Sequence, residues 1–488
     1  MTDLHRTPYL EQRAEKYYFR RRLPFDSNSK SNRFFVFSLR TDIASEARDI
    51  SGRLTAMTTL AYDYARGCPT MDQNTFKALL SELVRFEIAA FEKARLATGP
   101  RSLAAAEFAA QREDAIQTTW SAARTEGGDR RAGLAATRAA FYTGPIAQRI
   151  VDFHADKGGL LRAEDLASYE VREEPTLAID FRGAQVHCCG AWCQGISMAQ
   201  TLAMLEQAGP DAARDGNQIN LHFLIEGLKR VFADREAHVT DPRFMQIAPE
   251  ALLDPAFIAD RLRSIDETSD PLPAPAAPAT VPSGERPVFE AGCADTSHVS
   301  VIDSAGNIFS ATPSDPSYDT VVIPGTGLSV SSRGSQSGAI PGHLNALAPG
   351  KRPRLTPNPI LGLKDGQPWL AMGTPGGDVQ VQAMAQVLIG MLDLGRTPRE
   401  AIEAPRVATY AFPGSFAPHD VHPNKVLFEA DMPENLIESL RARGHDLEQW
   451  PARTWMAGGV CIALRDISHA DAIADPRRAG TAKTGAKP

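Results

Sequence analysis

The stretch of sequence that decides the fold is Thr296-Ser-His-Val-Ser-Val-Ile-Asp-Ser-Ala-Gly-Asn-Ile-Phe-Ser-Ala-Thr312. Two apolar, β-branched runs flank a short polar turn, so the stretch predicts a strand–turn–strand. The preceding residues 272–282 are rich in proline and alanine, which excludes a helix or a central strand and predicts a mobile linker. A hydroxyl residue at this position suggests a chain that cuts itself before Thr296. The new N-terminal threonine would then be a nucleophile with its own α-amine as base, in an amide-bond hydrolase made as a precursor.

The composition is that of a soluble globular protein, with 488 residues, 43% hydrophobic and 23% charged. The net charge of −7 gives no overall attraction to nucleic acid or to anionic membranes. The polar N-terminus has no apolar signal core and no segment is long and apolar enough to span a membrane, so we expect a cytoplasmic protein. Six cysteines make no disulfide framework, and the cluster Cys188, Cys189 and Cys193 favours structural thiols over a zinc site.

Residues 1–40 are locally basic and contain two aromatic-rich runs, at 17–24 and 33–40, which predict strands joined by a turn at 26–32. Helices are expected from about Thr41 and over 72–96, 103–125 and 130–141. From Phe141 onward the pattern alternates between helix and strand. The expected elements there are helices at 145–157, 196–208, 219–238, 381–394 and 398–404, a strand pair at 176–186 and a strand at 368–372.

The segment Gly373-Thr-Pro-Gly376-Gly377-Asp378 lies between the predicted strand 368–372 and an amphipathic helix. Two glycines at such a junction leave backbone N–H groups free to point at one spot, and the helix N-terminus adds positive potential. Gly376 and Gly377 are therefore candidates for an oxyanion hole. An ordinary strand–helix turn is the alternative, which the nearby candidate nucleophile makes the less favoured one.

Other charged groups have plainer interpretations. The basic segment 351–358 either lines a carboxylate-binding pocket or is a solvated loop. His298 shares a strand face with Thr296 and either supports its geometry or simply packs. Glu226, Asp234 and Arg235 have helical charge spacing and are expected to form structural ion pairs.

Residues from about 130 to 478 resemble the γ-glutamyltranspeptidase family of N-terminal-nucleophile hydrolases. The order and spacing of nine short stretches carry the resemblance: Phe-Tyr-Thr-Gly-Pro-Ile-Ala (141–147), Gly-Gly-Leu-Leu-Arg-Ala-Glu-Asp-Leu-Ala-Ser-Tyr (158–169), Phe-Arg-Gly (181–183), Leu-His-Phe-Leu-Ile-Glu-Gly-Leu-Lys-Arg-Val-Phe-Ala-Asp-Arg (221–235), Asp-Thr-Ser-His-Val-Ser-Val (295–301), Ala-Pro-Gly-Lys-Arg-Pro (348–353), Gly-Thr-Pro-Gly-Gly (373–377), Glu-Ala-Pro-Arg (403–406) and Ala-Asp-Pro-Arg (474–477).

The resemblance implies an α+β fold, a four-layer αββα sandwich built from a large and a small subunit. It implies that Thr296 is the autocleavage residue and nucleophile, that Gly376 and Gly377 stabilise the oxyanion, and that Ser314 stands where the family has a threonine that hydrogen-bonds the nucleophile's amine. It implies neither a metal nor an organic cofactor. The partners it implies are a small-molecule amide and the chain's own cleaved subunit, in a heterodimer that can itself dimerise.

The segment that binds the substrate departs from the family pattern. Where the family has an acidic Asn-Asn-Gln-x-Asp-Asp-like run, this chain reads Ser331-Ser-Arg-Gly-Ser-Gln336, and the family's serine pair reads Leu355-Thr356. We place Arg333, Gln336, Leu355 and Thr356 at the substrate. The lost acidic group argues against a γ-glutamyl substrate. Residues 317–327 with Arg333 resemble the oxamate-amidohydrolase branch of the family, which implies a small anionic amide.

Residues 1–125 do not match the family's N-terminal portion, so we expect an incomplete sandwich preceded by a small basic module. That module resembles the N-terminal region of phage-type tyrosine recombinases through 17–24, 37–41 and 44–48. The resemblance implies that Arg20, Arg21, Arg22 and Arg33 contact DNA phosphates, whereas a basic cap without a DNA role is the alternative. The expected domains are 1–125, a partial large-subunit region over 126–295, a small-subunit region over 296–478 and a disordered tail over 479–488.

Three hypotheses about function follow. The chain is an autoprocessed, γ-glutamyltranspeptidase-like amide hydrolase or acyltransferase that is cut at Asp295–Thr296 and acts on γ-glutamyl or small anionic amides; a catalytically inactive, truncated or chimeric relic of that family; or a DNA-binding protein that uses its basic module. The state of the Asp295–Thr296 peptide bond separates the first two hypotheses.

Overall fold

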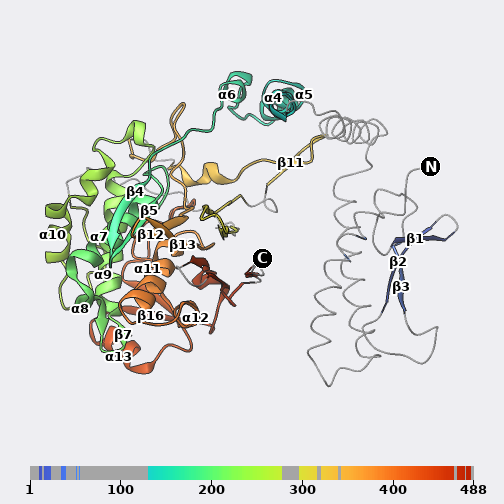
Figure 1. Ribbon diagram of the computed structural model, residues 1–488. Coiled ribbons are helices and arrows are strands. Elements are labelled where there is room, and N and C mark those ends of the chain that lie inside the picture. Colours follow the sequence, from blue (N-terminus) through green and yellow to red (C-terminus); the bar gives the residue numbers. More distant parts are fainter. Residues whose placement is uncertain are drawn as a thin grey trace. The chain divides into compact units, whose positions relative to one another are not determined.

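Figure 1 shows a computed structural model of the chain. The structure describes residues 10–13, 16–22, 34–39, 51, 54, 130–276, 296–315, 320–338, 342–465, 470–478 and 480–484. It divides into two compact units, Met1–Thr137 and Arg138–Pro488. The predicted helices at 72–96 and 103–125 and most of the linker at 272–282 fall outside the described residues, so those predictions stay untested.

The first unit contains a three-stranded antiparallel sheet in the order β1-β2-β3. Its strands are β1 (Leu10–Arg13), β2 (Lys16–Arg22) and β3 (Phe34–Ser38). The strands predicted at 17–24 and 33–40 correspond to β2 and β3, which pair with Tyr18 opposite Ser38. Sequence reasoning missed the short polar strand β1, whose Leu-Glu-Gln-Arg composition has no strand pattern.

A six-stranded antiparallel sheet in the order β18-β17-β13-β12-β5-β4 is the centre of the second unit. Its members come from distant parts of the chain and include the strand pair predicted at 176–186. They are β4 (Leu177–Phe181), β5 (Ala184–Cys188), β12 (Ile360–Lys364), β13 (Gln367–Gly373), β17 (Cys461–Arg465) and β18 (Ala470–Ala474).

Helices pack on this sheet and on one another, and their apolar residues form the main hydrophobic core with those of the strands. The helices of this layer are α7 (Gly195–Ala208), α9 (Leu221–His238), α10 (Pro255–Arg263) and α11 (Val379–Leu392) (Figure 1). They lie within a few residues of the helices predicted at 196–208, 219–238 and 381–394. The buried stretch of α11 is nearly all apolar or amide-bearing, which places this helix in the centre of the core.

A two-stranded hairpin, β8 (Val299–Ile302) and β9 (Ile308–Ala311), contacts β13 and β17. Five consecutive residues of β13, Trp369–Gly373, are buried. Because successive side chains of a strand point to opposite faces, both faces of β13 are covered, one by helices and the other by the hairpin. The other face of the hairpin exposes Val299, Val301 and Phe309, which are 44%, 46% and 56% exposed. Helix layer, large sheet and hairpin are three successive layers of the predicted αββα arrangement.

The remaining described elements are a second small sheet, short strands and further helices. A second sheet has the order β14-β15-β16, in which β15 and β16 are parallel. The bounds are α4 (Arg130–Tyr142), α5 (Pro145–Asp156), α6 (Ala163–Ala167), α8 (Pro210–Ala213), β6 (Arg214–Asp215), β7 (Gln218–Ile219), β10 (Val322–Ile323), β11 (Leu328–Ser329), α12 (Pro398–Glu403), β14 (Val407–Thr409), β15 (Lys425–Glu429), α13 (Glu434–Ala442) and β16 (Asp446–Trp450), with short 3₁₀ turns at Pro242–Phe244, Pro249–Leu253, Arg333–Gln336 (η5) and Trp455–Ala457. Among the described helices, none combines the length and apolarity that crossing a bilayer requires.

A buried ion cluster ties the end of the chain to this second sheet. The Arg477 guanidinium contacts Glu429 through Nε at 2.8 Å and Nη2 at 2.5 Å, and Nη1 lies 3.2 Å from Asp475. Asp475 in turn accepts an ion pair from Arg406 at 2.7 Å. All four side chains are almost fully buried, so each charge depends on its partners.

We expect Arg477→Ala to destabilise the fold by about 3–5 kcal/mol, because it leaves the Glu429 carboxylate buried without its main partner. The free energy of unfolding from urea denaturation measures the change. Arg399→Ala is the control: Arg399 is 67% exposed and pairs with Glu403 across one helical turn, so its loss should cost less than about 1 kcal/mol. Equal effects of the two substitutions would contradict the prediction.

Candidate active site

Hairpin register brings Thr296 and Ser314 together. The strands β8 and β9 pair Val299 with Ala311, and the backbone continues in the same register because Ser297 N–H donates to Pro313 O at 2.9 Å. Extended by three residues on each side, this register sets Thr296 opposite Ser314. Their hydroxyl oxygens are 2.5 Å apart, and Thr296 is only 6% exposed. A candidate nucleophile therefore lies at the open end of a hairpin, in hydrogen-bond contact with a second hydroxyl.

Arg333, at the start of the 3₁₀ turn η5, holds Ser314 from the other side. Its Nε donates to Ser314 O at 2.6 Å, and its Nη2 donates to Ser314 Oγ. The guanidinium also lies 5.3 Å from the centre of the Phe416 ring. Arg333 is buried, so its charge is partnered within the protein.

The predicted oxyanion loop has a backbone that favours glycine. Gly376 and Gly377 have φ values of +130° and +58°, which side-chain-bearing residues rarely adopt. A Cβ on Gly377 would lie 3.3 Å from the Phe416 ring, and one on Gly376 would lie 3.5 Å from the Gly458 Cα. The Phe416 ring thus touches both the glycine loop and Arg333, which links the loop to Ser314 and Thr296.

An ion-pair network that sequence reasoning missed anchors this loop. The Asp378 carboxylate follows the glycines and receives Arg235 Nη1 at 2.6 Å, Ser415 N–H at 2.8 Å and Gln194 Nε2 at 2.5 Å. Burial would raise the pKa of Asp378, but Arg235 and the Ser415 hydrogen bonds outweigh it and hold that pKa below its usual value. Asp378 is therefore a fixed negative charge that holds the N-terminus of α11.

Arg235 has a different role from the one predicted. It contacts its chain neighbour Glu236 at 3.0 Å and reaches beyond its own helix to Asp378. Glu236 in turn binds Arg354. The intrahelical ion pair is formed elsewhere on α9, where Glu226 contacts Arg230 at 2.8 Å. The Phe-Ala-Asp-Arg235 motif was a signal for this role, because a charged residue at the end of a buried helix needs a partner.

Gln336, Leu355 and Thr356, predicted to be at the substrate, lie on the η5 and 354–356 segments. Gln336 Nε2 donates to Thr356 Oγ1 at 3.3 Å, and both side chains are fully buried. Leu355 N–H donates to Trp192 O at 3.0 Å. The structure brings Gln336 and Thr356 together and joins their segment to that of Arg333; their contact with a substrate stays a prediction. Arg20, Arg21 and Arg22 lie in β2, and Arg33 lies outside the described residues.

One described cluster has the residue types of a metal site. His222, Glu226 and His445 place nitrogen and carboxylate atoms within 4.8 Å of one another. However, Lys229 Nζ lies 2.7 Å from Glu226, whose other oxygen contacts Arg230, and His222 Nδ1 is bonded to His445 Nε2 at 2.9 Å. The ammonium and guanidinium already neutralise the carboxylate, so these residues do not fit a metal cation.

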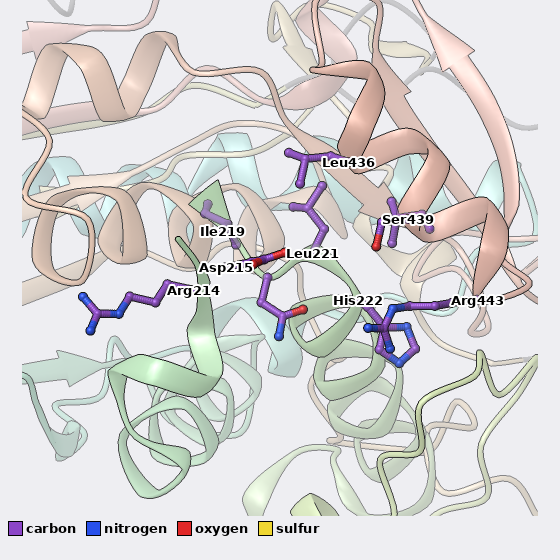
Figure 2. A pocket seen from close by; sticks show the side chains of 10 residues that line it. Arg214, Asp215, Ile219, Leu221, His222, Leu436, Ser439 and Arg443 are labelled. Atoms are coloured by element: carbon purple, nitrogen blue, oxygen red, sulfur yellow. The ribbon is translucent and has the colours of Figure 1, made fainter. Parts of the chain in front are cut away.

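His222 also borders a polar cavity of about 260 Å³. Figure 2 shows this cavity between the start of α9 and α13, with Arg214 and Arg443 at its sides. None of the residues predicted at the active site lines it. Arg214 is paired with Asp211 at 2.5 Å, and Arg443 donates to Glu267 O at 2.9 Å.

His298 supports the hairpin rather than serving as a base. Its Nδ1 lies 2.9 Å from Thr312 Oγ1 and its Nε2 lies 2.7 Å from Ser300 Oγ. The ring packs directly on Gly373, where a Cβ would come within 2.3 Å of it. Burial lowers the pKa of His298 to about 4, so the imidazole is neutral at pH 7.

The low pKa of His298 predicts a pH-dependent stability. Unfolded His298, with a pKa near 6.5, takes up a proton that the folded ring resists until about pH 4. Its contribution to stability is therefore complete above pH 6.5 and is lost as the pH falls from 6.5 towards 4, by roughly 2 kcal/mol at pH 5. Urea denaturation at pH 7 and pH 5 should show a smaller loss for His298→Gln than for the parent. Identical losses would count against the prediction.

The fold and this site define a class of protein. Helices on a large antiparallel sheet, covered on its other face by a hairpin that begins with a buried threonine, are the layers of an N-terminal-nucleophile hydrolase. The solved cephalosporin acylase from Bacillus halodurans has the same fold: it superposes with a TM-score of 0.59 at 26% identity, over 72% of this chain and 60% of that one.

The chain belongs to the gamma-glutamyltranspeptidase family, whose sequence model matches residues 112–485. It is 30% identical to the acylase ACY 1 proenzyme of Pseudomonas sp. (strain SE83), over 66% of this chain and 53% of that protein. It is 32% identical to the glutathione hydrolase-like YwrD proenzyme of Bacillus subtilis (strain 168), over 55% of this chain and 49% of that protein. The chain thus spans about half the length of these curated relatives.

These matches confirm the family and fold predicted from the sequence, and they place the chain in a family of enzymes. They leave the resemblance of residues 1–125 to recombinases as a prediction, since the family match begins at residue 112. The predicted domain boundaries and the cytoplasmic location also stay predictions.

Proposed function

We propose that this chain is an amide hydrolase or acyltransferase whose nucleophile is Thr296, freed by cleavage of the Asp295–Thr296 bond. The observation that carries the proposal is the 2.5 Å contact between the buried Thr296 and Ser314 hydroxyls. Of its relatives, both the acylase and the glutathione hydrolase-like protein are named proenzymes. The cleaved fragments would remain together as a heterodimer, because β8 and β9 pack on the large sheet that β4 and β5 complete.

Apart from water, maturation requires no group from outside the chain. Thr296 Oγ1 attacks the carbonyl carbon of residue 295, the C–N bond breaks, and the chain is joined through an ester. Water then hydrolyses the ester and leaves a free α-amine on Thr296. This amine can act as the base for the hydroxyl of the same residue.

Turnover uses the same hydroxyl. Thr296 Oγ1 attacks the amide carbon of the substrate while its proton passes to the α-amine. The N–H groups of the Gly376–Gly377 loop receive the oxyanion, and Asp378, fixed by Arg235, keeps that loop in place. The amine of the substrate leaves with a proton, and water or an acceptor amine takes the acyl group from the ester.

Cleavage of the purified full chain tests the proposal. A denaturing gel and mass spectrometry should show a fragment that begins at Thr296, and Thr296→Ala should remain one chain. Thr201→Ala is the matched control, because Thr201 is a buried threonine of α7 whose hydroxyl donates within its own helix, to Ser197 O at 2.8 Å. It should cleave like the parent. A folded parent that stays intact on long incubation would support the inactive relic instead.

The substrate is proposed to be a small anionic amide that lacks the α-amino group of a γ-glutamyl compound. The acidic run that would pair with an ammonium is replaced by Ser331–Gln336, which contains no acidic residue, and the resemblance of residues 317–327 to the oxamate-amidohydrolase branch implies an anionic amide. Glutaryl-p-nitroanilide should therefore be hydrolysed with a higher kcat/KM than γ-glutamyl-p-nitroanilide. The increase in absorbance from p-nitroaniline measures both rates, and a preference for the γ-glutamyl compound would reject this substrate class.

A further inference from the structure

The Arg333 guanidinium donates two hydrogen bonds to one residue, Ser314. Nε reaches the main-chain oxygen of Ser314 at 2.6 Å, and Nη2 reaches the side-chain oxygen of the same residue. Two directed bonds from a planar group fix both the backbone and the side chain of Ser314. Arg333 is 6% exposed, so bulk water does not compete for these two hydrogen bonds.

The chemistry of the two groups sets the direction of the protons. A guanidinium has only donors and stays charged at any relevant pH. The Ser314 oxygen must therefore accept from Arg333, and its own hydroxyl proton can be donated only to a group other than Arg333. Thr296 Oγ1 lies 2.5 Å from that oxygen. A hydroxyl that accepts from a cation is a stronger donor, so Ser314 O–H pointing at Thr296 would stabilise the deprotonated nucleophile.

The surroundings hold Arg333 in this position. The Phe416 ring lies 5.3 Å from the guanidinium carbon and against the glycine loop, and Ala417 N–H donates to Ser335 O at 3.1 Å. The turn that carries Arg333 and the segment that carries Phe416 are thus bonded to each other. The Phe416 ring therefore lies next to Arg333, which binds Ser314, and also next to the Gly376–Gly377 loop.

We propose that Arg333 is a positioning residue that orients the Ser314 hydroxyl proton toward Thr296, and that it is not the group that binds a substrate carboxylate. The inference rests on the proposed function, because it assigns Arg333 a part in activating Thr296. It differs from the expectation, made from the sequence, that Arg333 contacts the substrate.

The test compares Arg333→Gln, Ser314→Ala and the double variant in the full, matured chain. Two probes are used, the anionic glutaryl-p-nitroanilide and the neutral butyryl-p-nitroanilide, with rates referred to the cleaved fraction seen on a gel. We expect Arg333→Gln to lower kcat by roughly 10–100-fold on both probes with KM changed less than about 3-fold. The double variant should be no more than about 3-fold slower than Ser314→Ala. Both substitutions remove the same chain of hydrogen bonds from Arg333 through Ser314 to Thr296, so their effects should not add.

Two further variants keep the test decisive. Arg333→Lys retains a cation in the same space and should recover part of kcat, which also covers a failure of the glutamine variant to fold. Arg399→Gln, on an exposed helix position, should behave as the parent. A rise in KM confined to the glutaryl probe would overturn the inference in favour of direct carboxylate binding, as would additive losses in the double variant.

The outcomes separate this inference from the proposed function. If the parent cleaves itself and turns over a probe while Arg333→Gln matches it, the inference about Arg333 fails and the function stands. If the folded parent neither cleaves nor turns over either probe, the proposed function fails and this inference fails with it.

Discussion

The register of one β-hairpin is the constraint on which the rest of the site depends. Pairing of Val299 with Ala311 determines that Thr296 faces Ser314. A slip of one residue would turn every side chain of β8 to the other face. It would remove Thr296 from Ser314 and His298 from its contact with Thr312 on the opposite strand segment. The hairpin is therefore held by side-chain contacts of its own as well as by its packing on β13.

Buried charge holds the other half of the site. Arg235, Asp378, Glu236 and Arg354 form a continuous network in which every side chain is largely buried. Buried charges destabilise a fold unless they are paired with good geometry. Removing one charge of the network leaves its neighbours buried without a partner. The network joins the end of α9, the start of α11 and the segment before Thr356, which come from three distant parts of the sequence. The network holds the Gly376–Gly377 loop in place through Asp378.

Local pattern was enough to predict much of this molecule. The hairpin, the glycine loop and helices α7, α9 and α11 follow from short-range periodicity and turn residues, and the family followed from the order of its motifs. The partners of the charged groups could not be predicted from local pattern. Arg235 and Asp378, for example, are separated by 143 residues and meet only in the folded chain. Arg333 shows the same limit, because its contact with Ser314, 19 residues away in the sequence, could not be predicted from local pattern. Strand β1 was missed because its polar sequence has no alternation.

The close fit of His298 against Gly373 has a consequence for how this protein can change over generations. The imidazole occupies the volume that even a methyl group at residue 373 would need. A larger residue at position 373 is therefore accepted only after His298 has been replaced by a smaller one, so changes at 373 should be found together with changes at 298. A comparison of many homologous sequences should therefore show residues 298 and 373, which lie on two adjacent layers of the sandwich, changing as a pair.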